Sequence, residues 1–435
     1  MLSPADNAVV TQTGPGTAMG DLFRRYWMPA LLSEELAEAD GAPVQVRLLG
    51  EDLVAFRDTA GQIGLVSEFC PHRKASLFLG RNEDNGLRCV YHGWKFDVDG
   101  NCVDMPNEPP ESRFKEKVAH TAYLCGEAGG VIWAYMGPRD GQDVPPLPRF
   151  EWTLVPENQR WVHKIYQATN YLQGLEGGID SSHVSFLHAS ARQTPEGPRF
   201  DSVSIMPTAD GAPRFSVKEM DFGLLIAARR EMPDADTSYW RLTPYSLPFY
   251  TVIPGPLDDS AAFSGHAWVP IDDHSCWMYT YSWHPERPLD ELNRRGRHPA
   301  HLVATQPGTY YPLTNRANMY GLDRAAQKTT SFTGITNLSD QDRAVQETMG
   351  TIVDRPTEHL GTSDLGVIGA RRLLLRQARE LGQGQPPQPP RDASAFQVRS
   401  LSVLLPSEAT IDDAATEFAA RAIAQRQPLH AAPSA

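Results

Sequence analysis

The sequence has little of what defines the specialised protein classes. Its 435 residues include only five cysteines, too few and too odd in number for a disulfide framework. It contains no run of ~18 consecutive apolar residues, which argues against a transmembrane helix. Residues 1–20 have neither a basic start nor an apolar stretch, so we expect no signal peptide. Together these absences predict a soluble, cytoplasmic protein.

Positive charge is also scarce. The chain has 40 Lys and Arg against 53 Asp and Glu, a net charge of −13, and no basic block. This balance argues against nucleic acids and anionic membranes as partners. The composition, 41% hydrophobic and 21% charged, excludes intrinsic disorder and collagen-like repeats for most of the chain. At ~150 residues per domain, the length predicts two to three domains.

The first part of the chain has the pattern of β-strands. Residues 44–48 alternate between apolar and polar side chains, and Asp99-Gly100 is a two-residue hairpin signal. Residues 130–135 are typical of a buried strand, and a proline-rich stretch follows at residues 144–148. We therefore predict a small β domain over residues 1–150.

The remaining residues, 151–435, mix strand and helix signals, which predicts an α+β domain with a helical extension at its C-terminal end. Strand-like runs occur between residues 214 and 270. The segments that favour helices are 171–188, 339–381 with a break near Arg355-Pro356, and the short amphipathic piece 414–426. The composition of residues 382–390 indicates a linker or surface loop.

Two short segments each offer one thiolate and one imidazole, and sixteen residues separate them. The first holds Cys70 and His72, and the second holds Cys89 and His92. A tetrahedral zinc site with two Cys and two His is one interpretation. The other, which the spacing and the β context favour, is a [2Fe–2S] cluster with the cysteines on one iron and the histidines on the other. We interpret the remaining cysteines as small buried residues: Cys102, Cys125 and Cys276.

A second candidate metal site lies further along the chain. His183 and His188 are five residues apart, so on a regular helix they would point ~140° away from each other. They can bind one ion only if the helix is distorted between them or ends before His188, and we expect the glycines at 174, 177 and 178 to allow this. Two His and one carboxylate form the facial triad of non-haem Fe(II) oxygenases. In isolation, however, this spacing is more typical of ordinary helical and loop histidines. Spacing leaves four candidates for the carboxylate: Asp340, Asp342, Glu347 and Asp354.

With Arg73 after the first histidine and Gly93-Trp94 after the second, the first motif resembles the Rieske motif. Both motifs together, in this order, resemble the large subunit of Rieske non-haem iron ring-hydroxylating oxygenases over nearly the whole chain. Three further segments resemble the phthalate 4,5-dioxygenase branch: LFRRYWMPA at 22–30, QDRAVQE at 341–347 and EHLGTSD at 358–364.

The resemblance implies a fold and a set of site residues. The fold would be an all-β Rieske [2Fe–2S] domain followed by an α+β, helix-grip-like catalytic domain with an antiparallel sheet and helices. Asp180 matches the carboxylate that, in the family, bridges an iron-ligand histidine and a cluster histidine across a subunit boundary, and Asn170 matches a position near the iron. For Asn170 a helix-start role is equally open. The implied metal ligands are Cys70, His72, Cys89 and His92 for the cluster and His183, His188 and Asp342 for the iron.

The resemblance also implies cofactors and partners. Each subunit would hold one [2Fe–2S] cluster and one Fe²⁺ and would assemble into a homotrimer or a multiple of it. Electrons from NADH would arrive through a separate flavin- and iron–sulfur-containing reductase, since no GxGxxG follows a strand in this chain. The implied reaction is O₂-dependent hydroxylation of an aromatic carboxylate, of the phthalate dihydroxylation type. The alternatives are an O-demethylating monooxygenase of methoxylated aromatic acids and, from a different class, a Rieske electron carrier without oxygenase activity.

An aromatic acid in a partly apolar pocket favours an arginine as its partner, because the guanidinium binds a carboxylate through two hydrogen bonds. Arg214 and Arg241 lie in strand-like segments of the second part, and both are candidates for substrate binding. An exposed or ion-paired role is the competing interpretation for each. The aromatic run at residues 245–250 would line the pocket or belong to the core.

Overall fold

The computed structural model describes residues 2–139, 144–194, 197–201, 206–257, 262–290, 303–385 and 393–424. Its N-terminal part begins with helices α1 (Pro4–Thr11) and α2 (Ala18–Phe23). A six-stranded antiparallel sheet follows, with the order β1 (Trp27–Leu32), β10 (Val131–Tyr135), β9 (Ala122–Ala128), β4 (Ile63–Ser67), β3 (Glu51–Arg57) and β2 (Val44–Leu48). The strands predicted at residues 44–48 and 130–135 are therefore confirmed.

A smaller four-stranded sheet carries the predicted hairpin. Its strands are β5 (Arg81–Asn82), β6 (Leu87–Arg88), β7 (Lys95–Phe96) and β8 (Cys102–Asp104). The connection between β7 and β8 is longer than the expected two residues, since Phe96 pairs with Cys102. The reason is local: the Asp97 carboxylate accepts hydrogen bonds from the backbone N–H groups of Asp99 and Asn101 and folds the turn around itself.

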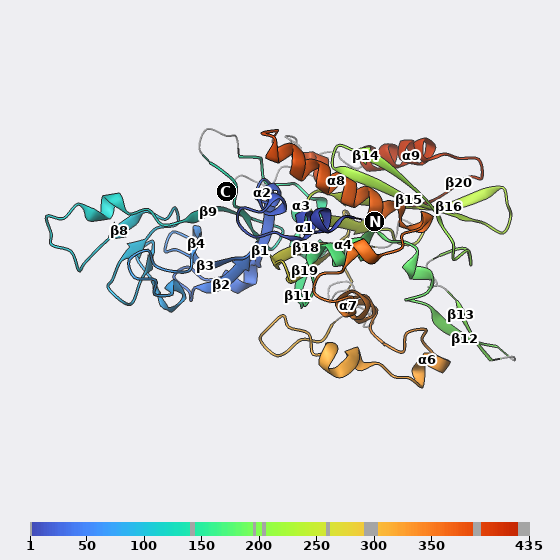
Figure 1. The fold of residues 1–435 in the computed structure, drawn as a ribbon, viewed down its shortest axis with the longest axis horizontal. Coiled ribbons are helices and arrows are strands. Elements are labelled where there is room, and N and C mark those ends of the chain that lie inside the picture. Colours follow the sequence, from blue (N-terminus) through green and yellow to red (C-terminus); the bar gives the residue numbers. More distant parts are fainter. Residues whose placement is uncertain are drawn as a thin grey trace.

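The second part is built on an eight-stranded antiparallel sheet, which with its helices confirms the expected α+β class (Figure 1). The strand order is β11 (Arg160–Gln167), β19 (Ser275–Trp283), β18 (Phe263–Asp272), β17 (Tyr250–Ile253), β16 (Thr237–Ser246), β15 (Gly223–Glu231) and β14 (Arg214–Met220), with β20 (Leu401–Pro406) also paired to β16. A separate hairpin joins β12 (Ser190–Thr194) and β13 (Gly197–Asp201).

Helices cover both faces of this sheet. Helix α8 (Leu365–Gly382) packs on the face that carries Leu224 and Ile226, whereas α9 (Ile411–Ala424) packs its Phe418 on the opposite face. Figure 1 shows both helices along one side of the molecule and α7 (Leu338–Thr348) on the other. The remaining helical elements are α3 (Glu151–Leu154), α4 (Tyr171–Ile179), α6 (Ala326–Thr329) and short 3₁₀ turns, among them His183–Ser185, Arg316–Gly321 and Arg355–Thr357.

The predicted helical region at 339–381 is thus two helices with a break at Arg355-Pro356, as expected. The amphipathic piece near the C-terminal end corresponds to α9. Residues 386–390 of the predicted linker lie outside the described residues. Within the described ranges, no helix is both long and apolar enough to cross a membrane.

The hydrophobic core runs without interruption across the predicted domain boundary near residue 150. One cluster of buried side chains contains Phe23 and Trp133 from the first part and Tyr250 from the second. Hydrogen bonds also join the two parts of the chain. Tyr250 Oη donates to the Trp27 carbonyl at 3.1 Å, and the Thr13 N–H donates to Asp273 at 2.7 Å. The division at 1–150 and 151–435 stays a prediction.

Candidate metal centres

The two cysteine–histidine segments fold into similar turns that bring their histidine rings close together. In the first, the Cys70 carbonyl accepts a hydrogen bond from the N–H of Lys74 at 2.9 Å, and in the second the Cys89 carbonyl accepts one from Gly93 at 3.0 Å. Lys74 and Gly93 both have positive φ, 61° and 79°, so each turn closes through a left-handed residue. The structure thereby brings together two loops that are separate in the sequence.

The side chains in these turns fit the predicted cluster. The rings of His72 and His92 lie 4.5 Å apart between centroids, and the buried Nδ1 of His92 has no hydrogen-bond partner among the described residues. Burial, with Cys89 beside it, raises the pKa of the Cys70 thiol to about 11. A buried thiolate therefore needs a positive partner here, which bound iron supplies.

Aromatic rings cover both histidines. The Trp94 indole stacks on the His72 imidazole with centroids 4.4 Å apart and planes within 8°, and the Tyr91 ring lies 3.9 Å from that of His92. Trp94 is buried, and its Nε1 donates to Asn107 at 2.7 Å. This packing holds the His72 ring in a fixed orientation.

The second site begins where α4 ends. We expected a helix up to His188, but α4 stops at Ile179. Asp180 is extended at the helix end, with φ −88° and ψ 105°, and His183 starts a separate 3₁₀ turn. Of the two alternatives for bringing the histidines together, the structure takes the one in which the helix ends first.

Three predicted ligands converge after this break. The ligand atoms of His183, His188 and Asp342 all lie within 4.8 Å of one another. Asp342 Oδ1 is 3.6 Å from His183 Nε2 and 3.4 Å from His188 Nε2. Burial alone would raise the pKa of Asp342, but His188 and His183 outweigh it and lower the pKa, so the carboxylate stays ionised. Two imidazoles and one carboxylate whose ligand atoms converge in this way are the donor set of a non-haem Fe(II) site.

Of the other carboxylates that spacing left open, two form ion pairs and the third, Asp354, is exposed. Asp340 and Glu347 are buried and form ion pairs with Arg343 of the same helix, at 2.7 and 3.2 Å. Asp180, by contrast, lies at the edge of the site with its Oδ2 3.5 Å from His183 Nδ1. Its side chain is 29% exposed, so a neighbouring molecule can reach it.

The glycines of α4 do not distort the helix. A Cβ at Gly174 or Gly178 would come within 2.2 Å of the Trp268 indole, and one at Gly177 would come within 2.3 Å of Gln346. These glycines therefore let β18 and α7 approach α4 closely. The helix ends directly after Gly177 and Gly178, at Ile179, and our expectation that the glycines allow this early end stays a prediction.

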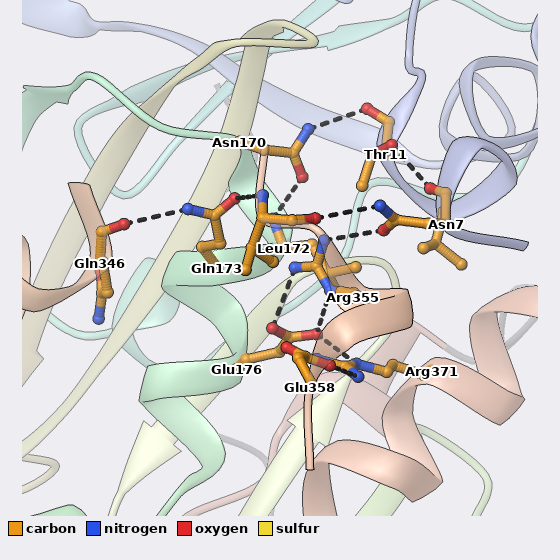
Figure 2. A network of polar contacts seen from close by, with 12 residues as sticks. Asn7, Thr11, Asn170, Leu172, Gln173, Glu176, Gln346, Arg355, Glu358 and Arg371 are labelled. Carbon is orange, nitrogen blue, oxygen red and sulfur yellow. Dashed lines mark hydrogen bonds and ion pairs between the residues drawn. The ribbon is translucent and has the colours of Figure 1, made fainter. Parts of the chain in front are cut away.

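A buried polar network fixes the start of α4 (Figure 2). Asn170 caps the helix: its Oδ1 accepts from the Leu172 N–H at 3.1 Å, and its Nδ2 donates to the carbonyls of Thr11 and Asp273. About ten residues of helical rise, roughly 15 Å, separate it from Asp180. The structure gives Asn170 the helix-start role and does not bring it to the converging ligands.

Further along α4, Glu176 accepts hydrogen bonds from two buried arginines, Arg355 at 3.0 Å and Arg371 at 2.6 Å (Figure 2). Arg355 also donates to Asn7 of α1, and Arg371 also pairs with Glu358. The network thus ties α4 to the N-terminal helix and to α8. It fixes the helix whose end sets the position of Asp180.

The two candidate substrate arginines have different surroundings. Arg214 is 65% exposed and pairs with Glu231 on the surface, so the structure does not bring it to the metal ligands. Arg241 is 2% exposed; its Nη2 donates to the Pro254 carbonyl at 2.8 Å, while Nε and Nη1 have no hydrogen-bond partner among the described residues. A buried guanidinium with free N–H groups is costly unless a ligand satisfies it.

Arg241 lies on the sheet face that α4 covers. The strand registers place it on the same face as Arg230, Thr251 and Trp268, and Trp268 contacts α4. The buried hydroxyl of Thr251 also lacks a partner in the described part of the chain. The aromatic run at 245–250 belongs instead to the core, since Tyr245, Phe249 and Tyr250 are buried in the main cluster.

Arg230 connects this face to the end of α4, and sequence reasoning missed it because no local pattern relates its strand to that of Arg241. Its guanidinium is fully buried and donates to the carbonyl of Ser181 at 2.6 Å. Burial and the charge of Arg241 lower the pKa of Arg230 to about 10, while Asp180 acts in the opposite direction. Arg230 therefore lies within electrostatic reach of both residues.

An apolar hollow of about 410 Å³ opens on the outer side of His183. Its lining includes Phe186, Phe332 and Val345, all exposed, together with the buried Gln341. The hollow lies beside the partly exposed His183 ring, so it gives access to the site from outside.

Comparisons with known proteins agree with this arrangement. A model described as Rieske [2Fe–2S] domain matches residues 26–122, and one described as LigXa C-terminal domain like matches residues 134–427. The chain is 42% identical to the phthalate 4,5-dioxygenase oxygenase subunit of Pseudomonas putida, over 86% of each chain. It is 40% identical to the 3-chlorobenzoate-3,4-dioxygenase oxygenase subunit of Comamonas testosteroni, over 86% of this chain and 88% of the relative.

A third relative is the 5,5'-dehydrodivanillate O-demethylase oxygenase subunit of a Sphingobium species, 32% identical over 89% of this chain and 83% of its own. Among solved structures, dicamba monooxygenase bound to dicamba has the same fold, with a TM-score of 0.56 and 16% identity over 83% of this chain and 98% of that one. The chain therefore belongs to the Rieske non-haem iron oxygenases, in the branch of the phthalate 4,5-dioxygenase oxygenase subunit, and is a terminal oxygenase subunit that uses a [2Fe–2S] cluster, a mononuclear iron and a separate reductase.

Proposed function

We propose that Cys70, His72, Cys89 and His92 hold the cluster and that His183, His188 and Asp342 hold the mononuclear iron. The paired turns and the unpartnered His92 Nδ1 support the first set. The convergence of three ligand atoms within 4.8 Å supports the second. When bound, the cluster supplies single electrons and the iron activates O₂.

We further propose that the protein hydroxylates an aromatic carboxylate, with ring dihydroxylation of the phthalate type as the reaction. The observation that carries this proposal is Arg241, a buried guanidinium with two unpartnered nitrogens on the sheet face that α4 covers. A substrate carboxylate satisfies these N–H groups through two parallel hydrogen bonds. The names of the two relatives at 40–42% identity, a chlorobenzoate and a phthalate dioxygenase, agree with an aromatic acid.

The chain's own residues then act in defined ways. Arg241 binds and orients the acid, and the Thr251 hydroxyl is available for a second polar contact. Arg230 holds Ser181, and with it the neighbouring Asp180, at a fixed distance from the substrate face. Because position decides which ring atoms react, this anchoring sets the site of hydroxylation.

The third relative supports a second candidate, O-demethylation of a methoxylated aromatic acid. Arg241 would bind the substrate carboxylate in either reaction. The two reactions would then differ in which part of the substrate faces the iron site, ring carbons for dihydroxylation or a methoxy group for O-demethylation. The electron-carrier alternative has less support, since the matched relatives are oxygenase subunits over most of their length.

The test is to supply the purified protein with an NADH-driven reductase and ¹⁸O₂, and to offer phthalate and methoxylated benzoates. A cis-diol that contains both labelled oxygens supports ring dihydroxylation. Formaldehyde together with a new phenol supports O-demethylation instead. Oxidation of NADH without any oxygenated product from either acid class would reject both.

We also propose a cytoplasmic homotrimer, or a multiple of it, reduced by a flavin- and iron–sulfur-containing reductase. Head-to-tail contact needs two different surfaces on each subunit. Exposed apolar side chains occur in two places. In and near the cluster turns they are Leu79, Val90 and Tyr91. At the hollow beside His183 they are Phe186, Phe332 and Val345. We expect Leu79→Glu to convert the assembly to monomers in analytical ultracentrifugation, and an unchanged mass would contradict this interface.

A further inference from the structure

The imidazole of His188 has a second contact that neither the motif nor the comparisons assign. Its Nδ1 lies 2.8 Å from Oε1 of Gln341, the residue directly before Asp342. Gln341 is 4% exposed, and its Nε2 donates to the carbonyl of Ile335 at 2.6 Å. The amide therefore spans from the imidazole to the loop that precedes α7.

This pair of contacts fixes the tautomer of a neutral His188 imidazole. An amide can face a carbonyl oxygen only with its NH₂ group, so the bond to Ile335 sets which way the Gln341 amide points. Oε1 must then face His188, and an oxygen only accepts. The proton of the neutral imidazole therefore lies on Nδ1, which leaves the lone pair of Nε2 directed at Asp342, 3.4 Å away.

We propose that Gln341 is a positioning residue for the mononuclear iron, one that holds His188 in the tautomer and ring orientation that bind the metal. The inference rests on the proposed ligand set His183, His188 and Asp342. It extends that set by a residue that contacts no metal and acts through His188. Histidines that bind metals generally donate their second ring nitrogen in this way.

The two histidines differ in this respect. Among the residues that the structure describes, the contact given for His183 Nδ1 is the Asp180 carboxylate at 3.5 Å, too far for a strong hydrogen bond. His188 is held tightly by a neutral amide that is itself anchored. The site therefore has one rigid imidazole and one that can adjust, and the rigid one depends on Gln341.

The loop and helix around Gln341 are also fixed. Asn337 caps α7, with its side chain accepting from the Asp340 N–H at 3.1 Å. Gln341 and Ile335 both line the hollow beside His183. The wall of the hollow and the orientation of His188 are thus set by the same side chain.

The experiment measures iron affinity, not turnover. We would determine the Fe²⁺ dissociation constant anaerobically, by chelator competition, while the visible spectrum reports that the cluster stays intact. Gln341→Leu removes the acceptor, and we expect it to weaken binding by about 10- to 100-fold. Gln341→Glu keeps an acceptor oxygen for His188 but loses the donor to the Ile335 carbonyl, so we expect an affinity between those of the Leu variant and the wild type.

A matched control lies on the same helix. Gln346 is buried, accepts a hydrogen bond from Gln167 and does not contact His188. We expect Gln346→Leu to lower the stability of the protein but to leave the iron affinity unchanged. The proposal is overturned if Gln341→Leu binds iron like the wild type, if Gln346→Leu weakens binding equally, or if the Glu variant is as weak as the Leu variant.

His188→Ala separates this proposal from the ligand assignment. It should lose the mononuclear iron altogether. If His188→Ala retains iron, the ligand set is wrong; if it loses iron and Gln341→Leu does not, only the role of Gln341 is wrong.

Discussion

The indole of Trp268 lies so close to Gly174 that a Cβ on the glycine would stand 2.2 Å from its Nε1. Trp268 belongs to β18 and is buried, and Gly174 belongs to the middle of α4. This contact sets the distance between the sheet that carries Arg241 and the helix that ends at Asp180. The proposed substrate face and the candidate iron site therefore lie close together because Gly174, like Gly178, has no side chain.

We expect Gly174→Ala to destabilise the protein by about 1–3 kcal/mol, because the added methyl group overpacks a buried ring that has no room to move. Gly382→Ala is the matched control: it also lies in a helix but faces open space, so we expect no loss and a gain of up to about 1 kcal/mol. Urea denaturation of both variants measures the difference. Equal stability of the two variants would show that the close approach does not matter.

The Arg241 proposal predicts opposite effects on binding and stability. We expect Arg241→Met to raise KM for the aromatic acid by about 10- to 100-fold, because a charge-assisted hydrogen bond is lost. The free energy of unfolding should stay the same or rise, since a buried guanidinium with two unpartnered nitrogens disappears. Steady-state kinetics and thermal denaturation test both.

Arg214→Met is the control for this prediction, because Arg214 is exposed and ion-paired with Glu231. We expect its KM to match the wild type. A KM that rises equally in both variants, or only in Arg214→Met, would remove Arg241 from the substrate site.

Asp180→Asn tests the electron route. We expect both metals to remain, because Asp180 is not among the converging ligands, but reoxidation of the reduced cluster should slow by at least about 100-fold. Stopped-flow absorbance of the reduced protein mixed with O₂ and substrate follows this step. Reoxidation at the wild-type rate would exclude a bridging role.

The buried network around Glu176 predicts a pH dependence of stability. Burial alone would raise the pKa of Glu176, but Arg355 and Arg371 outweigh it and lower the pKa below its ordinary value of 4.5. A carboxyl with a lowered pKa stabilises the folded state above pH 4.5, and that contribution is lost as the pH falls through the lowered pKa.

Glu176→Gln should therefore cost about 3 kcal/mol at neutral pH, since it leaves buried arginine charge uncompensated. The difference from the wild type should shrink as the pH falls below about 4.5. Urea denaturation at a series of pH values measures it. A difference that stays constant over this range would mean that Glu176 is not ionised in the folded protein.

Local patterns in the sequence, with the family resemblance, were sufficient to select the candidate metal ligands that the structure brings together. The spacing around Cys70 and His92 is a property of two short turns, and the resemblance supplied Asp342 where spacing left several carboxylates open. Contacts between distant segments could not be predicted. Nothing in the α4 sequence indicates that Trp268 lies against its glycines, or that the amide of Gln341 reaches His188. Such contacts depend on how α4, α7 and β18 pack, which periodicity does not encode.

The iron content per chain tests the central claim, that one chain carries two separate metal centres held by the residues named above. We predict about three irons for the wild type, since a [2Fe–2S] cluster and one mononuclear iron add to three. His183→Ala should contain about two, with the visible spectrum of the cluster unchanged and turnover abolished. Loss of the cluster's colour in His183→Ala, or retention of all three irons, would contradict the assignment.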